Sequence, residues 1–311
     1  MYEYKKKGEG ATFIFPVCLS YMYTNSYIPG AMNNDLYTKT AFHTSCLFTR
    51  NYSTSFYSAT GLLAPQIRQA IYGIYGFVRL ADEIVDTFSG FSQQELLEQL
   101  EEEYQEGRRT GLSLNPVIHA FICVVNRYHI DDSLVRAFLR SMRADLTKKV
   151  YHTAEEINRY IYGSADVVGL MCLKVFTDND SALYERLKKS AMKLGSAFQK
   201  INFLRDLKND TEILDRSYFP GVTRQSFCER DKRHIIAGIE DDLSEAYTGL
   251  RQLPTSSRLG VYLAYVYYSK LLEKIKKTPA HTLINKRIRV SDFNKMLLFT
   301  RSFLLNKVNL L

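Results

Sequence analysis

The sequence of 311 residues contains no tryptophan, and only 7 prolines and 16 glycines interrupt it. Proline and glycine break helices, and few segments alternate apolar and polar residues as half-buried strands do. Because both helix breakers and strand patterns are scarce, the sequence predicts an all-α protein. Apolar residues make up 46% of the chain, which is enough to build a sizeable core.

The chain also lacks the spacings that bind zinc or form disulfides. None of its five cysteines forms a CxxC pair, and none of its six histidines forms an HxxxH pair. The cysteines are Cys18, Cys46, Cys123, Cys172 and Cys228. This pattern favours reduced thiols in the cytoplasm and argues against a zinc site, and we expect His119 to be a core residue.

No apolar run reaches the ~20 residues that a membrane-spanning helix needs. At the N-terminus, Lys5–Lys7 precede an apolar run from Ala11 to Tyr23, as in a signal peptide, but a small-residue cleavage site is missing. We therefore expect residues 1–31 to be a leader that is disordered or results from a start site placed too far upstream. Residues 32–311 are expected to form one domain.

The formal net charge is +8, which suits nucleic acid, an anionic membrane surface or a phosphorylated substrate. The basic residues are dispersed and no nucleic-acid-binding module is recognisable, so nucleic acid is not expected as a partner. Two basic groups near the C-terminus, Lys274–Lys277 and Lys286–Arg289, are open to two interpretations. They form either a solvated face or a peripheral contact with anionic lipid.

Apolar spacing and capping signals predict about nine or ten helices in a single domain. The expected helices cover residues 36–50, 65–88, 92–108, 116 onward, 131–146, 153–176, 182–214, 231–253, 256–277 and 291–308. Ser92 with Glu95, and Thr153 with Glu156, have the spacing of capping boxes.

A narrow polar row follows the helix expected over residues 182–214. Gln199, Asn202, Asp206 and Asp210 are spaced three, four and four residues apart and therefore share one face, bordered by apolar side chains. Two carboxylates one turn apart repel each other, which favours a hard divalent cation between them. The alternative interpretation is an exposed face of aspartate and asparagine.

A second row of this kind follows an earlier helix, where Tyr75, Arg79, Asp82 and Asp86 border a buried stripe. One DxxxD is weak evidence, but two such pairs facing each other could not all ionise without cations. Mg²⁺ prefers one or two carboxylates together with water and substrate phosphates. The two pairs therefore indicate a diphosphate substrate held by bridging metal ions.

An arginine accompanies each aspartate pair. Arg79 lies one turn before Asp82, and Arg205 directly precedes Asp206. Guanidinium groups at these positions could neutralise phosphate oxygens of a bound substrate. The alternative is that each arginine forms an ion pair along its own helix.

Three segments resemble the squalene/phytoene synthase family of head-to-head isoprenyl diphosphate synthases. The resemblance extends from about residue 45 to 295, and its wording is most similar to the bacterial carotenoid enzymes. The segments that carry it are 72–86 (YGIYGFVRLADEIVD), 160–169 (YIYGSADVVG) and 194–206 (LGSAFQKINFLRD), the last completed by Asp210 and 216–220 (RSYFP).

The resemblance implies a single-domain isoprenoid synthase bundle with a central cavity between the two aspartate-rich helices. It implies metal and diphosphate binding by Asp82, Asp86, Asp206 and Asp210. It further implies substrate contacts from Ser53, Ser55, Phe56, Arg79, Gln199, Asn202, Tyr267 and Arg287. Tyr160 matches the tyrosine near the reacting centre, whereas its sequence context alone favours a core tyrosine with a satisfied hydroxyl.

The resemblance also implies an activity: Mg²⁺-dependent condensation of two geranylgeranyl diphosphates, through a cyclopropyl diphosphate, to phytoene in carotenoid biosynthesis. Mn²⁺ is an alternative metal, and NADPH is not expected. The alternatives are a squalene or dehydrosqualene synthase that uses farnesyl diphosphate, or a non-catalytic relative. A cytoplasmic protein is expected, with peripheral contact at the inner membrane face, while prenyl chain length, oligomeric state and the role of Asp166 are not fixed by the sequence.

Overall fold

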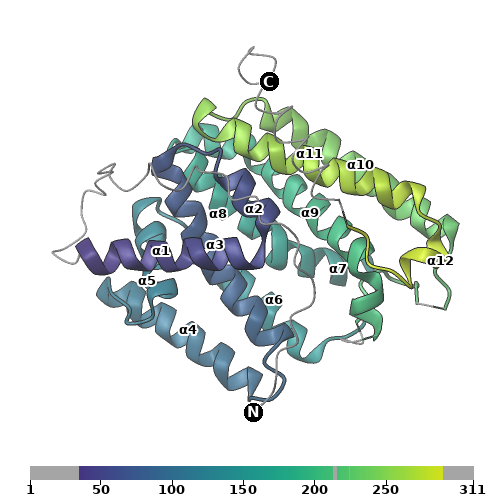
Figure 1. Ribbon diagram of the computed structural model, residues 1–311, viewed down its shortest axis with the longest axis horizontal. Helices are drawn as coiled ribbons and strands as arrows, with labels where there is room; N and C mark the ends of the chain where they lie inside the picture. Colours follow the sequence, from purple (N-terminus) through teal and green to yellow (C-terminus); the bar gives the residue numbers. More distant parts are fainter. Residues whose placement is uncertain (1–34, 213–215, 224, 290–311) are drawn as a thin grey trace, which may run out of the picture. The chain divides into compact units, whose positions relative to one another are not determined.

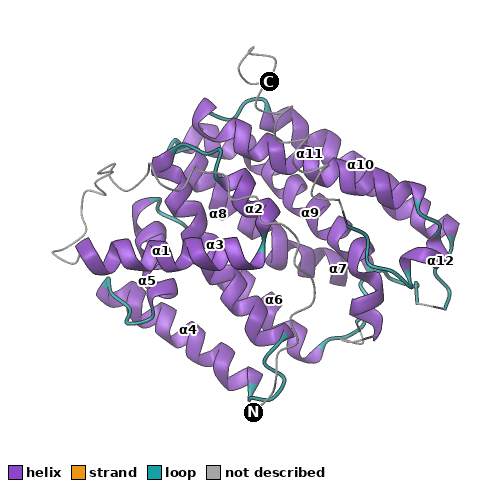
Figure 2. Cartoon of the chain, in the orientation of Figure 1, coloured by secondary structure: helices purple, strands orange, loops and turns teal. Residues whose placement is uncertain are grey.

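The computed structural model (Figure 1) describes residues 35–212, 216–223 and 225–289. Every regular element in these residues is a helix, as Figure 2 shows, and their one β-type contact is an isolated bridge between Val150 and Ser217. The all-α prediction is therefore confirmed for this part of the chain. The leader expected over residues 1–31, with its domain boundary, and the helix expected over 291–308 lie outside the described residues.

The described residues form twelve α-helices, and most of them begin and end within a few residues of the predicted positions. They are α1 (Asp35–Tyr52), α2 (Thr54–Thr60), α3 (Pro65–Asp86), α4 (Gln93–Thr110), α5 (Pro116–Arg127), α6 (Asp132–Thr147), α7 (Ala154–Ile161), α8 (Val167–Phe176), α9 (Ser181–Glu212), α10 (Glu229–Leu250), α11 (Thr255–Lys277) and α12 (Ala280–Leu283). The single helix predicted over 153–176 is divided by a π-helical turn, Tyr162–Asp166. Helices α2 and α12 were not predicted, because one or two turns are too short to show apolar periodicity.

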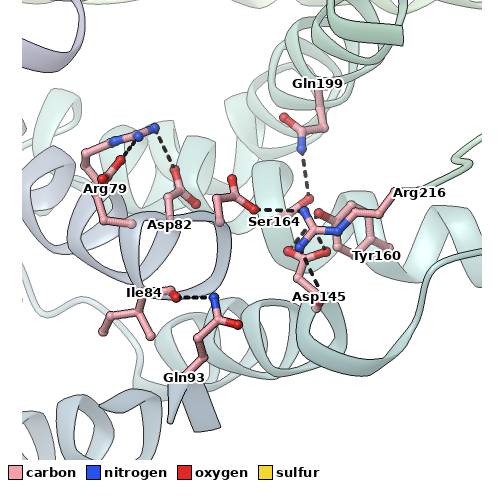
Figure 3. Close-up of polar contacts among 11 residues, drawn as sticks. Arg79, Asp82, Ile84, Gln93, Asp145, Tyr160, Ser164, Gln199 and Arg216 are labelled. Atoms are coloured by element: carbon pink, nitrogen blue, oxygen red, sulfur yellow. Dashed lines mark hydrogen bonds and ion pairs between the residues drawn. The ribbon is translucent and has the colours of Figure 1, made fainter. Parts of the chain in front are cut away.

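The two predicted capping boxes have different outcomes. Thr153 Oγ1 accepts a hydrogen bond from Glu156 N at 3.2 Å, but the Glu156 carboxylate accepts from the N–H of the residue before Thr153, so that box is half formed. The box predicted at Ser92 is wrong, since its side chain caps nothing. Gln93 Nε2 instead donates to Ile84 O at 2.7 Å and ties the start of α4 to the end of α3 (Figure 3).

The two aspartate-bearing helices, α3 and α9, are each surrounded by other helices (Figure 1). Helix α3 packs against α1, α4, α5, α6 and α8, whereas α9 packs against α8, α10, α11 and the π-helical turn. The core beneath α3 is aromatic: Phe77 stacks on Phe121 with ring centroids 4.1 Å apart, and both are fully buried. Burial of large aromatic side chains is a main source of stability, so this stack anchors α3.

Close backbone approach fixes α9 against the π-helical turn. A Cβ added to Gly195 of α9 would lie 2.8 Å from Ala165 O, and one added to Gly163 would lie 2.7 Å from Ala137 O of α6. Only glycine fits where backbones approach this closely. This close approach sets the position of the polar row on α9.

A buried lysine closes the end of α11. Lys232 of α10 is 4% exposed, and its Nζ donates to Thr278 O at 2.7 Å and to Lys276 O at 3.3 Å. Carbonyls at a helix C-terminus lack partners within the helix, so this ammonium group satisfies two of them.

The remaining fold-level expectations concern cysteines and membrane spans. None of the four cysteines in the described residues takes part in a disulfide. Across the same residues, no helix combines the length and the apolar character required for a membrane crossing.

Candidate active site

The polar row on α9 lies at the rim of the core. Gln199, Asn202, Asp206 and Asp210 are all half-buried, and the neighbouring Ile201 is fully buried. A solvated face would expose such short polar side chains, so the alternative of an exposed aspartate and asparagine face does not hold.

Arg79 lies beside two carboxylates of its own helix, α3. The Arg79 guanidinium forms an ion pair with buried Glu83, and its Nη1 lies 3.9 Å from Asp82 Oδ2 (Figure 3). Its Cζ also lies 4.6 Å from the ring centroid of Tyr52. Without substrate, Arg79 therefore pairs along its own helix, and its role toward a diphosphate stays a prediction.

Arg216 joins the two aspartate pairs. Its Nη1 donates to Asp86 Oδ1 on α3 at 2.8 Å, and its main-chain N donates to the Asp210 carbonyl of α9 at 2.7 Å. The residue is 6% exposed. Burial opposes its charge, but Asp145 and Asp86 more than offset this and raise the Arg216 pKa above its usual value. The sequence contained Arg216 in a matching segment but gave no reason to single it out.

Asp206 is held by two arginines. Arg205 Nε donates to Asp206 Oδ2 at 3.0 Å, and Arg287 Nε lies 2.6 Å from Oδ1. Both arginines were predicted substrate contacts, and the structure brings both to one carboxylate of the second aspartate pair.

Burial and the neighbouring carboxylate raise the pKa of one carboxyl in each pair. Burial raises the pKa of Asp82 to about 7; Arg79 opposes this shift and Asp86 adds to it. Burial and the neighbouring Asp206 raise the pKa of Asp210 to about 7. Carboxyls shifted in this way bind protons near neutral pH and would exchange them for a cation.

The donor set fits a hard divalent cation that is shared with a substrate. In the described residues, no group of three or more His, Cys, Asp and Glu side chains is arranged to hold a metal ion by itself. Asp82, Asp86, Asp206 and Asp210 offer oxygen ligands in pairs, and Mg²⁺ typically takes one or two carboxylates and completes its shell with water and phosphate oxygens. The metal roles of these four residues stay predictions.

Tyr160 lies in an aromatic cluster. It is 6% exposed, its ring centroid is 5.6 Å from that of Tyr218 and 5.0 Å from that of Tyr151, and its hydroxyl donates to Asp145 Oδ2 at 3.0 Å. Burial and the Asp145 charge raise the Tyr160 pKa well above its usual value. The structure thus shows a core tyrosine with a satisfied hydroxyl, and a catalytic role for it stays a prediction.

Asp145 was missed at the sequence level. It is 7% exposed, and burial raises its pKa to about 7, with Arg216 and Tyr160 opposing the shift. A signal was available: Asp145 follows Phe138 and Met142 at spacings of seven and three, on the buried face of α6. A carboxylate in an apolar stripe requires a partner, and here the partners are Tyr160 and Arg216.

The predicted phosphate-binding segment lies at the start of α2. Ser53 Oγ accepts a hydrogen bond from Phe56 N at 3.3 Å and caps this helix, and Ser55 is half-buried in its first turn. The Phe56 ring stacks on Tyr75 with centroids 4.8 Å apart. The structure therefore joins this segment to the polar row of α3.

The amides of α9 contact two other elements. Gln199 Nε2 donates to Ser164 Oγ of the π-helical turn at 3.5 Å (Figure 3), and Asn202 Oδ1 accepts from the Tyr268 hydroxyl at 3.3 Å. Tyr267, the tyrosine predicted for the cleft, contacts the Tyr268 ring with centroids 5.5 Å apart. Tyr268, which the sequence did not single out, is therefore the α11 residue bonded to the polar row.

Two open hollows, each with a volume of about 460 Å³, are lined by none of the four aspartates of the two pairs. One is lined by residues that include Arg108, His129 and Lys174, and the other lies between α10 and α11. The predicted cavity between the aspartate-rich helices stays a prediction.

Comparison with known proteins identifies the family that the sequence matches. The sequence model described as Squalene/phytoene synthase matches residues 49–294. The chain is 29% identical over 276 residues to a phytoene synthase of Arthrospira platensis, covering 80% of this chain and 88% of that protein. It is also 29% identical over 276 residues to a 15-cis-phytoene synthase of Synechocystis sp., covering 80% of each.

A solved structure shows the same fold. The crystal structure of a dehydrosqualene synthase in complex with ligand superimposes with a TM-score of 0.77 at 23% identity, covering 87% of this chain and 98% of that one. The similarity confirms the predicted isoprenoid synthase fold.

Proposed function

The chain belongs to the squalene/phytoene synthase family of prenyltransferases, and from this premise we propose that it is a phytoene synthase that condenses two geranylgeranyl diphosphates. The observation that carries the proposal is the junction of both aspartate pairs at Arg216, which contacts Asp86 of α3 and Asp210 of α9. Because phytoene synthases are among its relatives, we propose the C20 substrate in place of farnesyl diphosphate.

Asp82, Asp86, Asp206 and Asp210 would hold Mg²⁺, with Mn²⁺ as an alternative. When bound, the metal neutralises the diphosphate and makes it a better leaving group. Arg79, Arg205 and Arg287, which pair with carboxylates in the ligand-free chain, then become available for diphosphate oxygens. Guanidinium groups around the departing diphosphate stabilise the charge that develops on it.

The aromatic side chains protect the reacting carbons from water. Phe56 and Tyr75 form one stack beside the first pair, and Phe198 and Tyr268 form another beside the second, with centroids 4.8 Å and 3.8 Å apart. Apolar walls prevent capture of an allylic cation by water. The double bond of the second chain then attacks, and loss of a proton, guided by Tyr160, closes the cyclopropane.

The second half-reaction ends without a hydride. After the cyclopropyl diphosphate ionises and its carbon skeleton rearranges, loss of a proton yields phytoene, so NADPH is not required. Gln199 and Asn202, on the same face of α9 as the aspartates, would orient the rearranging chain.

The location of the protein is a separate proposal. We propose a cytoplasmic enzyme that touches the inner membrane face, where its long-chain substrate and product dissolve. Lys274 donates to Arg289 O at 2.6 Å and Lys276 pairs with Glu240, so part of the basic C-terminal region is engaged within the chain. Sedimentation with anionic vesicles tests the contact; no binding at low salt would contradict it.

Incubation with Mg²⁺ and radiolabelled geranylgeranyl or farnesyl diphosphate, in separate reactions with and without NADPH, tests the function. We expect phytoene from the C20 substrate under both conditions, lost on addition of EDTA. A C30 hydrocarbon formed in preference from farnesyl diphosphate would show a squalene synthase if its formation requires NADPH, and a dehydrosqualene synthase if it does not. If neither substrate yields hydrocarbon, the chain is a non-catalytic relative.

A further inference from the structure

Asp145 has one occupied oxygen and one that lacks a hydrogen bond. Oδ2 accepts from the Tyr160 hydroxyl at 3.0 Å, whereas Oδ1 is buried and has no hydrogen-bond partner. The cationic group beside this oxygen is Arg216, whose Nη1 lies 4.0 Å from Oδ1. An unsatisfied buried carboxylate oxygen is costly, so this atom has a strong tendency to acquire a donor.

Arg216 is already attached to Asp145 through another atom. Its Nη2 donates to the Asp145 main-chain carbonyl at 3.1 Å, while Nη1 donates to Asp86 Oδ1 at 2.8 Å (Figure 3 shows Arg216, Asp145 and Tyr160 together). One end of the guanidinium is therefore anchored to α6, and the other is shared between two carboxylates. A short movement of Nη1 would transfer it from Asp86 to Asp145.

The main chain keeps Arg216 beside Asp145 whichever carboxylate it pairs with. Ser217 N donates to Lys149 O at 2.7 Å, and Tyr151 N donates to Ser217 O at 3.2 Å. These bonds tie the segment after α6 to the segment after α9, so the guanidinium can change partner without displacement of its backbone.

We propose that Asp145 is a positioning residue that takes over Arg216 when a divalent cation occupies Asp86, so that cation binding at the aspartates is coupled to the carboxylate that holds Tyr160. The proposal relies on the proposed function only for the cation. Without Asp145, a cation at Asp86 would leave Arg216 as a buried, unpaired charge, and this penalty would oppose cation binding. With Asp145, the exchange also supplies the donor that Oδ1 lacks.

Mn²⁺ alone is the probe, and its affinity is measured by electron paramagnetic resonance. Asp145→Asn retains an acceptor for Tyr160 but removes the charge that receives Arg216. We expect the Mn²⁺ dissociation constant to rise about tenfold, the equivalent of about 1.4 kcal/mol. Arg216→Gln removes the competitor at Asp86, so Mn²⁺ affinity is expected to rise.

The double variant separates exchange from long-range charge effects. If Asp145 affects Mn²⁺ binding only by pairing with Arg216, adding Asp145→Asn to Arg216→Gln changes Mn²⁺ affinity less than twofold. If the two effects multiply, Asp145 acts only through its charge, and the proposal is overturned. An Asp145→Asn chain with Mn²⁺ affinity within twofold of the wild type also overturns it.

Asp166→Asn is the matched control. Asp166 is equally buried, accepts one hydroxyl hydrogen bond, from Ser196 at 2.7 Å, and has a raised pKa of about 6, but contacts neither Arg216 nor Tyr160 in the described residues. Its removal is expected to leave Mn²⁺ affinity unchanged. An equal loss in this variant would show a general charge effect and overturn the proposal.

Hydrogen exchange provides a second measurement in case Arg216→Gln does not fold. In the wild-type chain, Mn²⁺ is expected to leave amide exchange in the segment that contains Ser217 unchanged or slower. In Asp145→Asn, Mn²⁺ is expected to accelerate it several-fold, and equal behaviour of the two chains overturns the proposal. Failure to form hydrocarbon, with Mn²⁺ binding as described, would contradict the proposed function alone.

Discussion

Arg287 reaches Asp206 across 81 positions of the chain, and its Nε lies 2.6 Å from Asp206 Oδ1. Arg205 holds the other oxygen, and the Arg205 carbonyl accepts from Ile288 N at 3.4 Å, so side-chain and main-chain contacts both join this segment to α9. Asp206 therefore holds two arginines at the second aspartate pair.

Asp206→Asn is expected to reduce kcat by at least about 10²–10³-fold, because it removes a ligand charge and releases both arginines. Turnover of labelled geranylgeranyl diphosphate measures the loss, and far-UV circular dichroism is expected to remain helical. Asp241→Asn, on the exposed face of α10, is the control and should retain full activity. Undiminished activity in Asp206→Asn would remove the metal role assigned to this residue.

The rows on α3 and α9 could be predicted because each depends only on the periodicity of one helix. Contacts between distant segments could not: Arg216 and Asp86 are 130 positions apart, and nothing local in either segment indicates the other. The resemblance assigned Tyr267 to the cleft, and that role stays a prediction; it gave no indication that the neighbouring Tyr268 bonds Asn202. The π-helical turn was missed because nothing in its five residues, Tyr162–Asp166, distinguishes them from ordinary helix at the sequence level.

The pH dependence of stability should show the raised pKa of Asp82. Its folded-state pKa is about 7 and its ordinary value is 3.8, so between these pH values the folded chain binds a proton that the unfolded chain lacks. Without metal, this carboxyl therefore makes the free energy of unfolding fall as pH rises from about 4 to about 7. Asp145 and Asp210 act in the same direction, and buried His119, whose pKa is lowered, acts in the opposite one.

Urea unfolding in EDTA at pH 5 and pH 8 isolates the Asp82 contribution. The Asp82→Asn chain is expected to lose less stability across this interval than the wild type. It lacks the Asp82 carboxyl, one of the groups whose titration lowers the free energy of unfolding as pH rises. Equal losses in the two chains would contradict the raised pKa.

The close approach of α9 to the π-helical turn makes Gly195 sensitive to substitution. Gly195→Ala would place its Cβ 2.8 Å from Ala165 O and is expected to cost about 1–3 kcal/mol of unfolding free energy. Gly238→Ala on α10 meets no atom within 4 Å and should instead stabilise the chain by about 0.5–1 kcal/mol. Urea titration measures both, and opposite signs are required.

Lys232→Met is expected to lower stability without changing activity. It removes the ammonium group that satisfies the carbonyls of Lys276 and Thr278, and is expected to lower the free energy of unfolding by about 1–3 kcal/mol. Because Lys232 contacts neither aspartate pair, kcat should stay within twofold of the wild type at a temperature where the variant is folded. A large loss of kcat there would show that the end of α11 influences the site.

The long separation between Asp86 and Arg216 also determines when the site can be completed during synthesis. A ribosome that has made Asp86 must add 130 further residues before Arg216 exists, which takes about 7–26 seconds at typical rates of 5–20 residues per second. Throughout that interval the nascent chain carries its first aspartate pair without this arginine. Arg287 follows later still, so Asp206 can pair with both of its arginines only after position 287 has been translated.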